Sequence, residues 1–306
     1  MIKGTSRPEE YLLLCAHYDH LPQADGDTFP GADDNASGAA LLLELARHYA
    51  AHPPARSVVF AAFDGEEAGR QGSKAFVAAL PAGVKEKINA ALNFDTVGRL
   101  GAGRILALGS GSSDKWVHIL RGAGFVTGHD YAPAADLDSS DQASFIEAGV
   151  PALQFFSGPH EDYHKSSDTS DKIDARGLVK TAEFAREVAD YLAGDAEFIT
   201  RPAGTAPAGA GAAPAAAAPR RASTGLVPDF AFPGEGVRAQ DITPGSPLDK
   251  AGLKPGDVII QLEGKPVKDL RSYSEELKKF SPGQRISVTY LSGGAEAAAV
   301  IELAGR

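Results

Sequence analysis

Histidines and carboxylates follow four apolar runs in the first two hundred residues, and these side chains are the ones best suited to chemistry. The runs and the residues behind them are YLLLCA (11–16) before His17 and Asp19, VVFAAF (58–63) before Glu66 and Glu67, ALNF (91–94) before Asp95, and PALQFF (151–156) before His160 and His164. Another pair, Asp33 and Asp34, precedes an expected helix start. Taken singly, each pattern has an ordinary explanation, such as a helix cap or a solvated turn. Together they predict a site that needs cations, because several charges buried in one place are unfavourable without compensation.

The donor types narrow the choice of metal. The single cysteine, Cys15, lies inside an apolar run, so we expect neither a thiolate cluster nor an intramolecular disulfide. Imidazole together with carboxylate suits Zn²⁺, with Co²⁺ or Mn²⁺ as replacements, whereas Ca²⁺ and Mg²⁺ prefer an all-oxygen set. Five such ligands with one bridging carboxylate would hold two ions about 3.5–4 Å apart, the separation of hydrolytic metal pairs.

Runs of strand length alternate with helical periodicity over residues 1–198, which we expect to form the first domain. RILALG (104–109) adds a fifth strand, and the expected helices are 37–51, 71–80, 114–122 and 175–192. This alternation predicts an α/β domain with a mostly parallel mixed sheet sandwiched by helices. Because the carboxyl ends of parallel strands gather ligands, the histidines and carboxylates should meet at one edge of that sheet.

The rest of the chain predicts a linker and a second domain. Residues 199–223 are rich in Ala and Pro and predict a semi-extended linker. Residues 224–306 contain short strands, Gly/Pro turns and two short helices, and the block GSPLDKAGLKPGDVIIQLEGKPV resembles the PDZ family. The resemblance implies that a peptide C-terminus adds as a strand beside a sheet edge, its carboxylate held by the loop Gly225–Phe230.

Five motifs in residues 4–195 resemble those of the secreted di-zinc aminopeptidase family, which also contains glutamate carboxypeptidases and glutaminyl cyclases. The motifs are, in order, AHYDH, GADDNASG, FDGEEAG, NFDTVG and YHKSSDT. The resemblance implies a zinc-dependent exopeptidase with two Zn²⁺ per chain. The activity it favours is an aminopeptidase that hydrolyses N-terminal residues from peptides by a metal-activated bridging water.

Carried over position by position, the resemblance implies a zinc ligand set. The implied ligands are His17 and Asp95 for one ion, Glu67 and His164 for the other, and Asp33 as the bridge between both. The family pattern also implies a cis peptide bond between Asp33 and Asp34, directly after the bridging residue.

Three further residues receive implied roles. Glu66 would be the general base and acid, because it is adjacent to a ligand and could move a proton from water to the leaving amine. Asp19 would orient the His17 ring from the second coordination layer. Tyr163 would hydrogen-bond the tetrahedral intermediate.

Four alternatives stay open. HEDYH (160–164) matches the single-zinc pattern H-E-x-x-H, although no helix is predicted there. A carboxypeptidase would need a basic residue facing the substrate carboxylate, for which Arg99 and Arg104 are candidates. A glutaminyl cyclase would use one zinc without hydrolysis. A non-catalytic scaffold would keep only the binding of peptide C-termini by the PDZ domain.

Charge and hydropathy limit the partners. The chain carries a net charge of −10, and residues 1–200 hold 17 basic and 29 acidic side chains together with all eight histidines. This balance disfavours nucleic acid and anionic membranes and favours a cation or a peptide with a free N-terminus. No apolar run is long enough for a membrane span.

Two departures from the family pattern stand out. Gln142 occupies the third position of a segment, Ser140-Asp141-Gln142, in which the family has histidine. The sequence also begins within the family's first hairpin, so we expect its first N-terminal elements to be missing. No signal peptide is recognisable at the start, and the resemblance alone implies a secreted or periplasmic location.

Overall fold

The computed structural model describes residues 1–23, 26–134, 140–194, 197–199, 222–229, 232 and 234–305. The chain divides into two compact units, Met1–Ala212 and Ala213–Arg306, which are described separately. Most of the expected linker, 200–221, lies outside the described residues.

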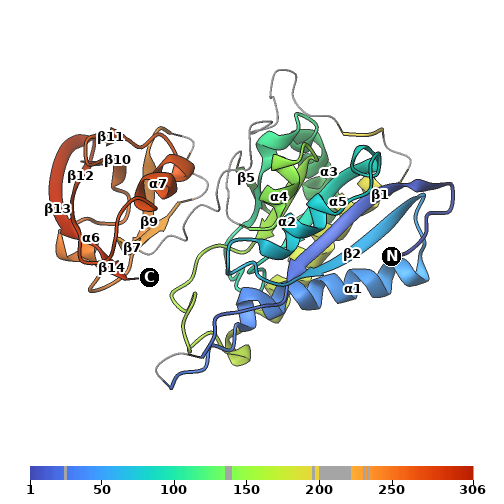
Figure 1. The fold of residues 1–306 in the computed structure, drawn as a ribbon, viewed down its shortest axis with the longest axis horizontal. Helices are drawn as coiled ribbons and strands as arrows, with labels where there is room; N and C mark the ends of the chain where they lie inside the picture. Colours follow the sequence, from blue (N-terminus) through green and yellow to red (C-terminus); the bar gives the residue numbers. More distant parts are fainter. Residues whose placement is uncertain are drawn as a thin grey trace. The chain divides into compact units, whose positions relative to one another are not determined.

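A six-stranded sheet forms the centre of the first unit (Figure 1). Its strands are β1 (Arg7–His17), β2 (Arg56–Phe63), β3 (Ile88–Phe94), β4 (Ile105–Leu108), β5 (Tyr131–Ala134) and β6 (Ala152–Phe156). Their order is β2-β1-β3-β6-β4-β5. The β4–β6 pair is antiparallel and the other neighbouring pairs are parallel. The expected mostly parallel mixed sheet is therefore confirmed.

Helices cover both faces of this sheet. They are α1 (Gly38–Ala51), α2 (Gln71–Ala78), α3 (Trp116–Thr127), α4 (Gln142–Glu147) and α5 (Ala175–Ala193), with short helical turns at η1 (Ala32–Ser37), η2 (Lys85–Lys87), η3 (Ser110–Ser112) and η4 (Ser170–Lys172). Apolar side chains of α1, α3 and α5 pack in one cluster with the sheet, and those of α2 and α4 pack in another. The unit is thus a three-layer α/β sandwich.

The side chains of β1 point alternately to the two faces of the sheet, so this strand contributes to both apolar clusters. Leu12, Leu14 and Ala16 belong to the cluster beneath α1, α3 and α5. Leu13 and Cys15 belong to the opposite cluster, because successive side chains of a strand point to opposite faces. All five are at most 1% exposed, so this continuous apolar run reads as a strand buried on both sides. The expected core position of Cys15 is confirmed.

One strand and one α-helix of the first unit were not predicted from the sequence. The edge strand β5 is four residues long and contains Pro133, which is tolerated at a sheet edge but weakens a strand signal. Helix α4 has only six residues, too few to show a helical period.

The second unit is β-rich. Its strands are β7 (Ala222–Ser223), β8 (Leu226–Pro228), β9 (Val237–Ile242), β10 (Val258–Leu262), β11 (Lys265–Pro266), β12 (Arg285–Ser292), β13 (Ala295–Glu302) and β14 (Ala304–Gly305), and its helices are α6 (Pro247–Lys250) and α7 (Leu270–Leu277). The main sheet runs β13-β12-β10-β9-β8, so β8 ends one side of it. Strand β7 pairs with β14, which means that Ala222 and Ser223 are folded rather than part of the expected linker.

Helix α7 begins with a reciprocal cap. The Asp269 carboxylate accepts from the Ser272 amide, while the Ser272 hydroxyl accepts from the Asp269 amide. Its residues Tyr273 and Leu277 are fully buried in the core of this unit. Across both units, none of the described helices combines the length and apolarity needed to cross a membrane.

Candidate metal centre

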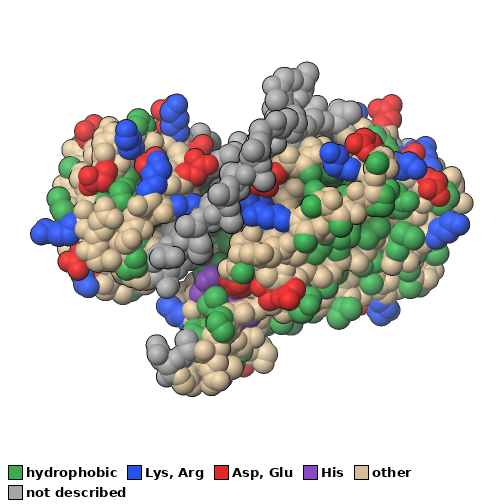
Figure 2. Space-filling model, in the orientation of Figure 1, with side chains coloured by type: hydrophobic (Ala, Val, Ile, Leu, Met, Phe, Trp, Pro, Cys, Tyr) green, Lys and Arg blue, Asp and Glu red, His purple; other side chains and the backbone are tan. Residues whose placement is uncertain are grey.

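The carboxyl ends of four strands bring the predicted site residues together. Strands β1, β2, β3 and β6 are parallel, so their carboxyl ends lie at one edge of the sheet. His17 is the last residue of β1, and Asp95 directly follows β3. The turn after β2 carries Glu66 and Glu67, and the loop after β6 carries His164. On one face of the first unit, histidine and acidic atoms are visible side by side (Figure 2).

Asp34 lies at the centre of this cluster. Its Oδ1 is 3.3 Å from Nε2 of His17, and its Oδ2 is 3.0 Å from Nε2 of His164. Nε2 of His17 is also 3.4 Å from Oδ1 of Asp95, and Nε2 of His164 is 3.1 Å from Oε2 of Glu67. One oxygen of the Asp34 carboxylate therefore faces the His17–Asp95 pair, and the other faces the His164–Glu67 pair.

The structure differs from the sequence expectation at the adjacent residue, Asp33. Its Oδ1 accepts hydrogen bonds from the Gly98 amide at 2.5 Å and the Ser37 hydroxyl at 2.9 Å, and its Oδ2 lies 3.2 Å from Nε2 of His160. This fully buried carboxylate contacts Gly98, Ser37 and His160, whereas the contacts with His17 and His164 belong to Asp34. The expected cis bond is also one residue off, because the structure has it between Asp34 and Asn35.

Asp33 and Asp34 could not be told apart by their types, since both are aspartates before the same helix. The difference arises in the η1 turn. Asn35 is buried there, and its side-chain amide donates to the carbonyls of His17 and Phe94 while its oxygen accepts from the amides of Gly38 and Thr96. Asn35 thus ties the turn to the ends of β1 and β3, and this attachment accompanies the inward position of Asp34.

Buried polar atoms that lack a hydrogen bond indicate whether the cluster could bind a cation. Oδ2 of Asp34 and Nε2 of His164 are 3.0 Å apart, yet neither makes a hydrogen bond within the described part of the chain. Buried polar atoms are nearly always hydrogen-bonded, and atoms that converge without bonding are typical of metal ligands. Imidazole and carboxylate donors without thiolate fit Zn²⁺. The cluster therefore fits a transition-metal site such as zinc.

Electrostatics point the same way. Burial acts to lower the pKa of His164, but contacts with Asp34 and Glu67 outweigh it and raise the pKa to about 9. Burial likewise opposes the protonation of His17, and Asp95, Asp19 and Asp34 raise its pKa strongly. The pKa of Asp34 is held well below its usual value by the two imidazoles in spite of burial. The carboxylates thus attract positive charge that bound cations would supply.

Glu66 behaves differently from its neighbour Glu67. Burial raises the pKa of Glu66 well above its usual value, and the negative charges of Asp95, Asp141 and Glu67 add to this effect. The pKa of Glu67 is lowered despite burial, because His164 and His20 contact its carboxylate. Two adjacent glutamates with opposite shifts are suited to different tasks, one to proton transfer and one to binding a cation.

Asp19 connects the first two ligand loops. Its carboxylate accepts from the amides of Glu66 at 3.1 Å and Glu67 at 3.2 Å. Nδ1 of His17 lies 3.1 Å from the Asp19 backbone carbonyl and 3.5 Å from Oδ1. The side chain of Asp19 thus positions the glutamate turn, and the His17 ring meets mainly its carbonyl.

A second buried carboxylate, Asp168, connects the other two loops. Its Oδ2 accepts from the amides of Asp33 at 2.9 Å and Asp34 at 3.1 Å. Its Oδ1 is 3.5 Å from Arg99, which donates to Asp162 at 2.9 Å in the loop that carries His164. Arg99 is therefore neutralised by two carboxylates.

The loop from His160 to His164 is a turn, not a helix. Nε2 of His160 approaches Asp33, while Nε2 of His164 approaches Asp34 and Glu67. The single-zinc helix motif requires both histidines on one helical face, so this alternative does not fit. The Tyr163 ring stacks on that of His164 with centroids 3.9 Å apart, and Tyr163 is 41% exposed.

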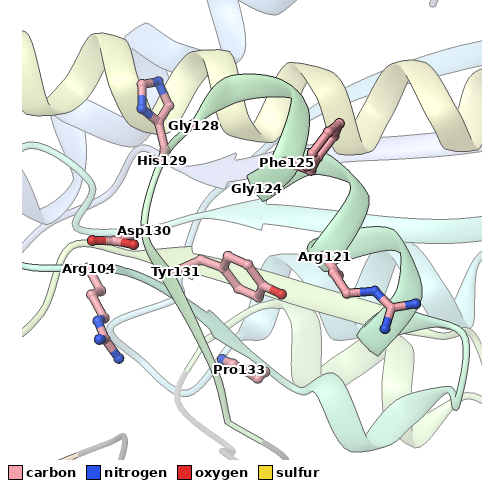
Figure 3. A pocket seen from close by; sticks show the side chains of 9 residues that line it. All are labelled: Arg104, Arg121, Gly124, Phe125, Gly128, His129, Asp130, Tyr131 and Pro133. Atoms are coloured by element: carbon pink, nitrogen blue, oxygen red, sulfur yellow. The ribbon is translucent and has the colours of Figure 1, made fainter.

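Arg104 lies in a different hollow. It lines an open pocket of about 520 Å³ together with Arg121, Phe125, His129 and Tyr131, between α3 and β5 (Figure 3). None of the residues of the cluster described above lines this pocket. Of the two arginines considered for a carboxypeptidase, Arg99 is therefore paired with carboxylates, and Arg104 lies outside the histidine–carboxylate cluster.

Sequence reasoning missed three residues of the site. His20 contacts Glu67, Asp34 takes the central position, and Asp168 holds the Asp33–Asp34 backbone. His20 and Asp168 stand inside the quoted motifs AHYDH and YHKSSDT, so a signal was present, but spacing alone assigned them no partner. Gln142 is buried and accepts from Asn93 at 3.4 Å.

Family models match both units. Residues 1–189 match Peptidase family M28, and residues 217–303 match the PDZ domain. The chain belongs to peptidase family M28. Its M28 domain is followed by a PDZ domain, as the sequence motifs indicated.

Relatives of the M28 domain include aminopeptidases. The chain is 29% identical over 197 residues to aminopeptidase YwaD of Bacillus subtilis, covering 60% of this chain and 42% of that one. It is 32% identical over 160 residues to an aminopeptidase of Pseudomonas aeruginosa, covering 49% of this chain and 29% of that one. The chain thus spans less than half the length of these relatives.

Solved structures agree with this fold. An aminopeptidase from Aneurinibacillus sp. strain AM-1 matches with a TM-score of 0.57 and 26% identity, over 65% of this chain and 48% of that one. A glutaminyl cyclase from an Acidobacteriales bacterium matches with a TM-score of 0.54 and 25% identity, over 63% of this chain and 71% of that one. Both kinds of enzyme share the architecture of the M28 domain.

Removing the Asp168 carboxylate should destabilise the M28 domain. In Asp168→Ala the buried amides of Asp33 and Asp34 lose their acceptor, so the free energy of unfolding should fall by about 2–4 kcal/mol. Trp116, the single and buried tryptophan of the chain, reports unfolding of this unit by fluorescence in urea. Asp171→Ala, at an exposed position of the same loop, is the matched control. Equal stability of the two variants would contradict the role given to Asp168.

Proposed function

We propose that the M28 domain is a zinc-dependent aminopeptidase that releases N-terminal residues from peptides. The observation that carries the proposal is the position of Asp34, whose two oxygens face two separate histidine–carboxylate groups. The aminopeptidases among the relatives support the same activity.

The proposed ligands follow the geometry. His17 and Asp95 would hold one zinc ion, and Glu67 and His164 would hold the other. Asp34 would bridge the two, in place of the Asp33 expected from the sequence. Asp33, fixed by Gly98 and Ser37, would instead support the loop.

Zinc, when bound, would act as a Lewis acid and make water a nucleophile near neutral pH. Glu66 would accept a proton from the attacking water and pass it to the leaving amine, since its raised pKa suits both steps. Tyr163 would donate a hydrogen bond to the developing oxyanion of the scissile carbonyl. The carboxyl groups of Glu66 and Asp95 would hold the free α-amino group of the substrate.

The other activities of the fold are less well supported. A carboxypeptidase would need a cation free to hold the substrate carboxylate, whereas Arg99 contacts Asp162 and Asp168. A glutaminyl cyclase would need one metal ion only, whereas the two oxygens of Asp34 face two separate sets of possible metal ligands, one with His17 and one with His164. Export from the cytoplasm stays a prediction from the family resemblance.

A general base at Glu66 makes a sharp kinetic prediction. Glu66→Gln should lower kcat for an aminoacyl-p-nitroanilide by about 10²–10⁴-fold and leave the zinc content unchanged. Glu161→Gln is the matched control, because Glu161 is exposed and would be the base only in the single-zinc motif. Loss of activity in Glu161→Gln, with Glu66→Gln active, would overturn the proposed site.

Metal content tests the number of ions. The purified chain should hold about two zinc ions by plasma emission spectroscopy, and a chelator should abolish hydrolysis until zinc is restored. A content near one, with cyclisation of N-terminal glutamine and no hydrolysis, would favour a glutaminyl cyclase. Absence of both metal and activity would leave a scaffold.

We propose that the PDZ domain binds the C-termini of peptides. Strand β8 ends its sheet among the described residues, and such an edge accepts an added strand. Gly225, directly before β8, has φ +82°, and its backbone meets Ser246 so closely that a Cβ atom would lie 2.2 Å from Oγ. Part of the expected loop, Phe230, lies outside the described residues.

Binding of C-termini should depend on this edge. A fluorescent peptide library with free carboxylates should bind by anisotropy, and amidated versions of the same peptides should bind at least ten-fold more weakly, because the carboxylate is lost. Gly225→Val should abolish binding, because the valine side chain would clash with Ser246. Gly293→Val is the control, because a side chain at Gly293 would meet no atom within 4 Å. Equal binding of free and amidated peptides would exclude this recognition.

A further inference from the structure

His20 stands at the metal cluster, but the ligand set proposed above gives it no role. Its Nδ1 lies 2.9 Å from Oε1 of Glu67 in good hydrogen-bond geometry. Ligand atoms of His20, Asp34 and Glu67 all lie within 4.8 Å of one another. The side chain is only 12% exposed. A histidine in this position is part of the site and not of the surface.

The two oxygens of Glu67 are divided between two histidines. Oε1 accepts the hydrogen bond from His20, whereas Oε2 lies 3.1 Å from Nε2 of His164, which makes no hydrogen bond within the described residues. The contact of Oε1 with His20 is therefore a hydrogen bond, whereas Oε2 and Nε2 of His164 remain available to bind a metal ion. The division leaves one oxygen of Glu67 for the metal and assigns the other to His20.

The ring of His20 is held where this division requires it. Gly31 has φ +59°, and a Cβ atom there would come within 2.7 Å of two carbons of the His20 ring. The ring also meets that of His164 edge-on, with centroids 5.9 Å apart. His20 thus has little freedom to turn away from Glu67.

We propose that His20 is a positioning residue for the second metal position: by donating Nδ1–H to Oε1 of Glu67, it directs Oε2 of Glu67 toward Asp34 and His164. The inference rests on the proposed zinc function and deepens it. A fixed carboxylate loses less conformational freedom when it binds an ion, so His20 raises the metal affinity of that position without touching the metal.

Stepwise binding of Co²⁺ tests the proposal without reference to activity. The full chain, stripped of metal, is titrated with Co²⁺ while the visible absorption is followed, and competition with a chelator gives two dissociation constants. His20→Ala should weaken one of the two constants about 10–100-fold and leave the other unchanged. His118→Ala, at an exposed histidine of α3, is the control for unspecific binding to histidine.

Rescue and coupling identify how His20 acts. His20→Asn should restore most of the lost affinity, because the Asn amide nitrogen can replace Nδ1–H. In a Glu67→Ala background, His20→Ala should cause no further loss, because the effect passes through Glu67. Urea unfolding followed by Trp116 fluorescence checks that each variant is folded.

The outcomes separate the two proposals. If the unmodified chain binds two Co²⁺ and His20→Ala leaves both constants unchanged, the inference is wrong and the zinc function stands. If His20→Asn loses as much affinity as His20→Ala, His20 is itself a ligand and the positioning role is wrong. If the unmodified chain binds no Co²⁺, the proposed function itself fails.

Discussion

An excess of buried negative charge at one edge of the sheet is the constraint on which the first unit depends. Asp33 and Asp34 are almost completely buried, and Asp95 and Glu67 are largely so. Among the described contacts, these carboxylates face histidines, backbone amides and the hydroxyls of Ser37 and Thr96. Such a cluster is unfavourable unless cations or protons offset the charge. Burial opposes protonation of His17, yet the surrounding carboxylates raise the pKa of its ring strongly.

The scaffold meets this constraint with interactions between loops. Parallel strands deliver the ligands to one edge, but they do not by themselves fix the loops that follow. Asn35 ties the ends of β1 and β3, Asp19 holds the glutamate turn, and Asp168 holds the backbone of Asp33 and Asp34. Non-glycine residues with positive φ stand directly at the site, at Thr96 and at His164 itself. Backbone conformations of this kind persist where surrounding contacts determine them, and they cluster at functional sites.

Two modules of different chemistry share one chain. The M28 domain presents a charged cluster at a sheet edge, whereas the PDZ domain presents a strand, β8, that ends its sheet among the described residues. Under the proposed functions, the first would act on peptide N-termini and the second would bind peptide C-termini. The chain would then join two means of peptide recognition that do not compete for the same group.

Much of the fold was readable from the sequence, because buried strands and amphipathic helices leave periodic apolar patterns. The runs at 11–16 and 91–94 predicted β1 and β3, and the residues behind them predicted which edge carries the site. Short elements such as α4 left no period to read. The sequence also determined the donor types, imidazole and carboxylate without thiolate, and hence the class of metal. Only the tertiary structure shows that Asp34 rather than Asp33 lies beside His17 and His164, because this depends on the η1 turn and its attachment through Asn35. His20 and Asp168 became site residues for the same reason: their partners lie 47 and 135 residues away in the chain, and only folding brings them together.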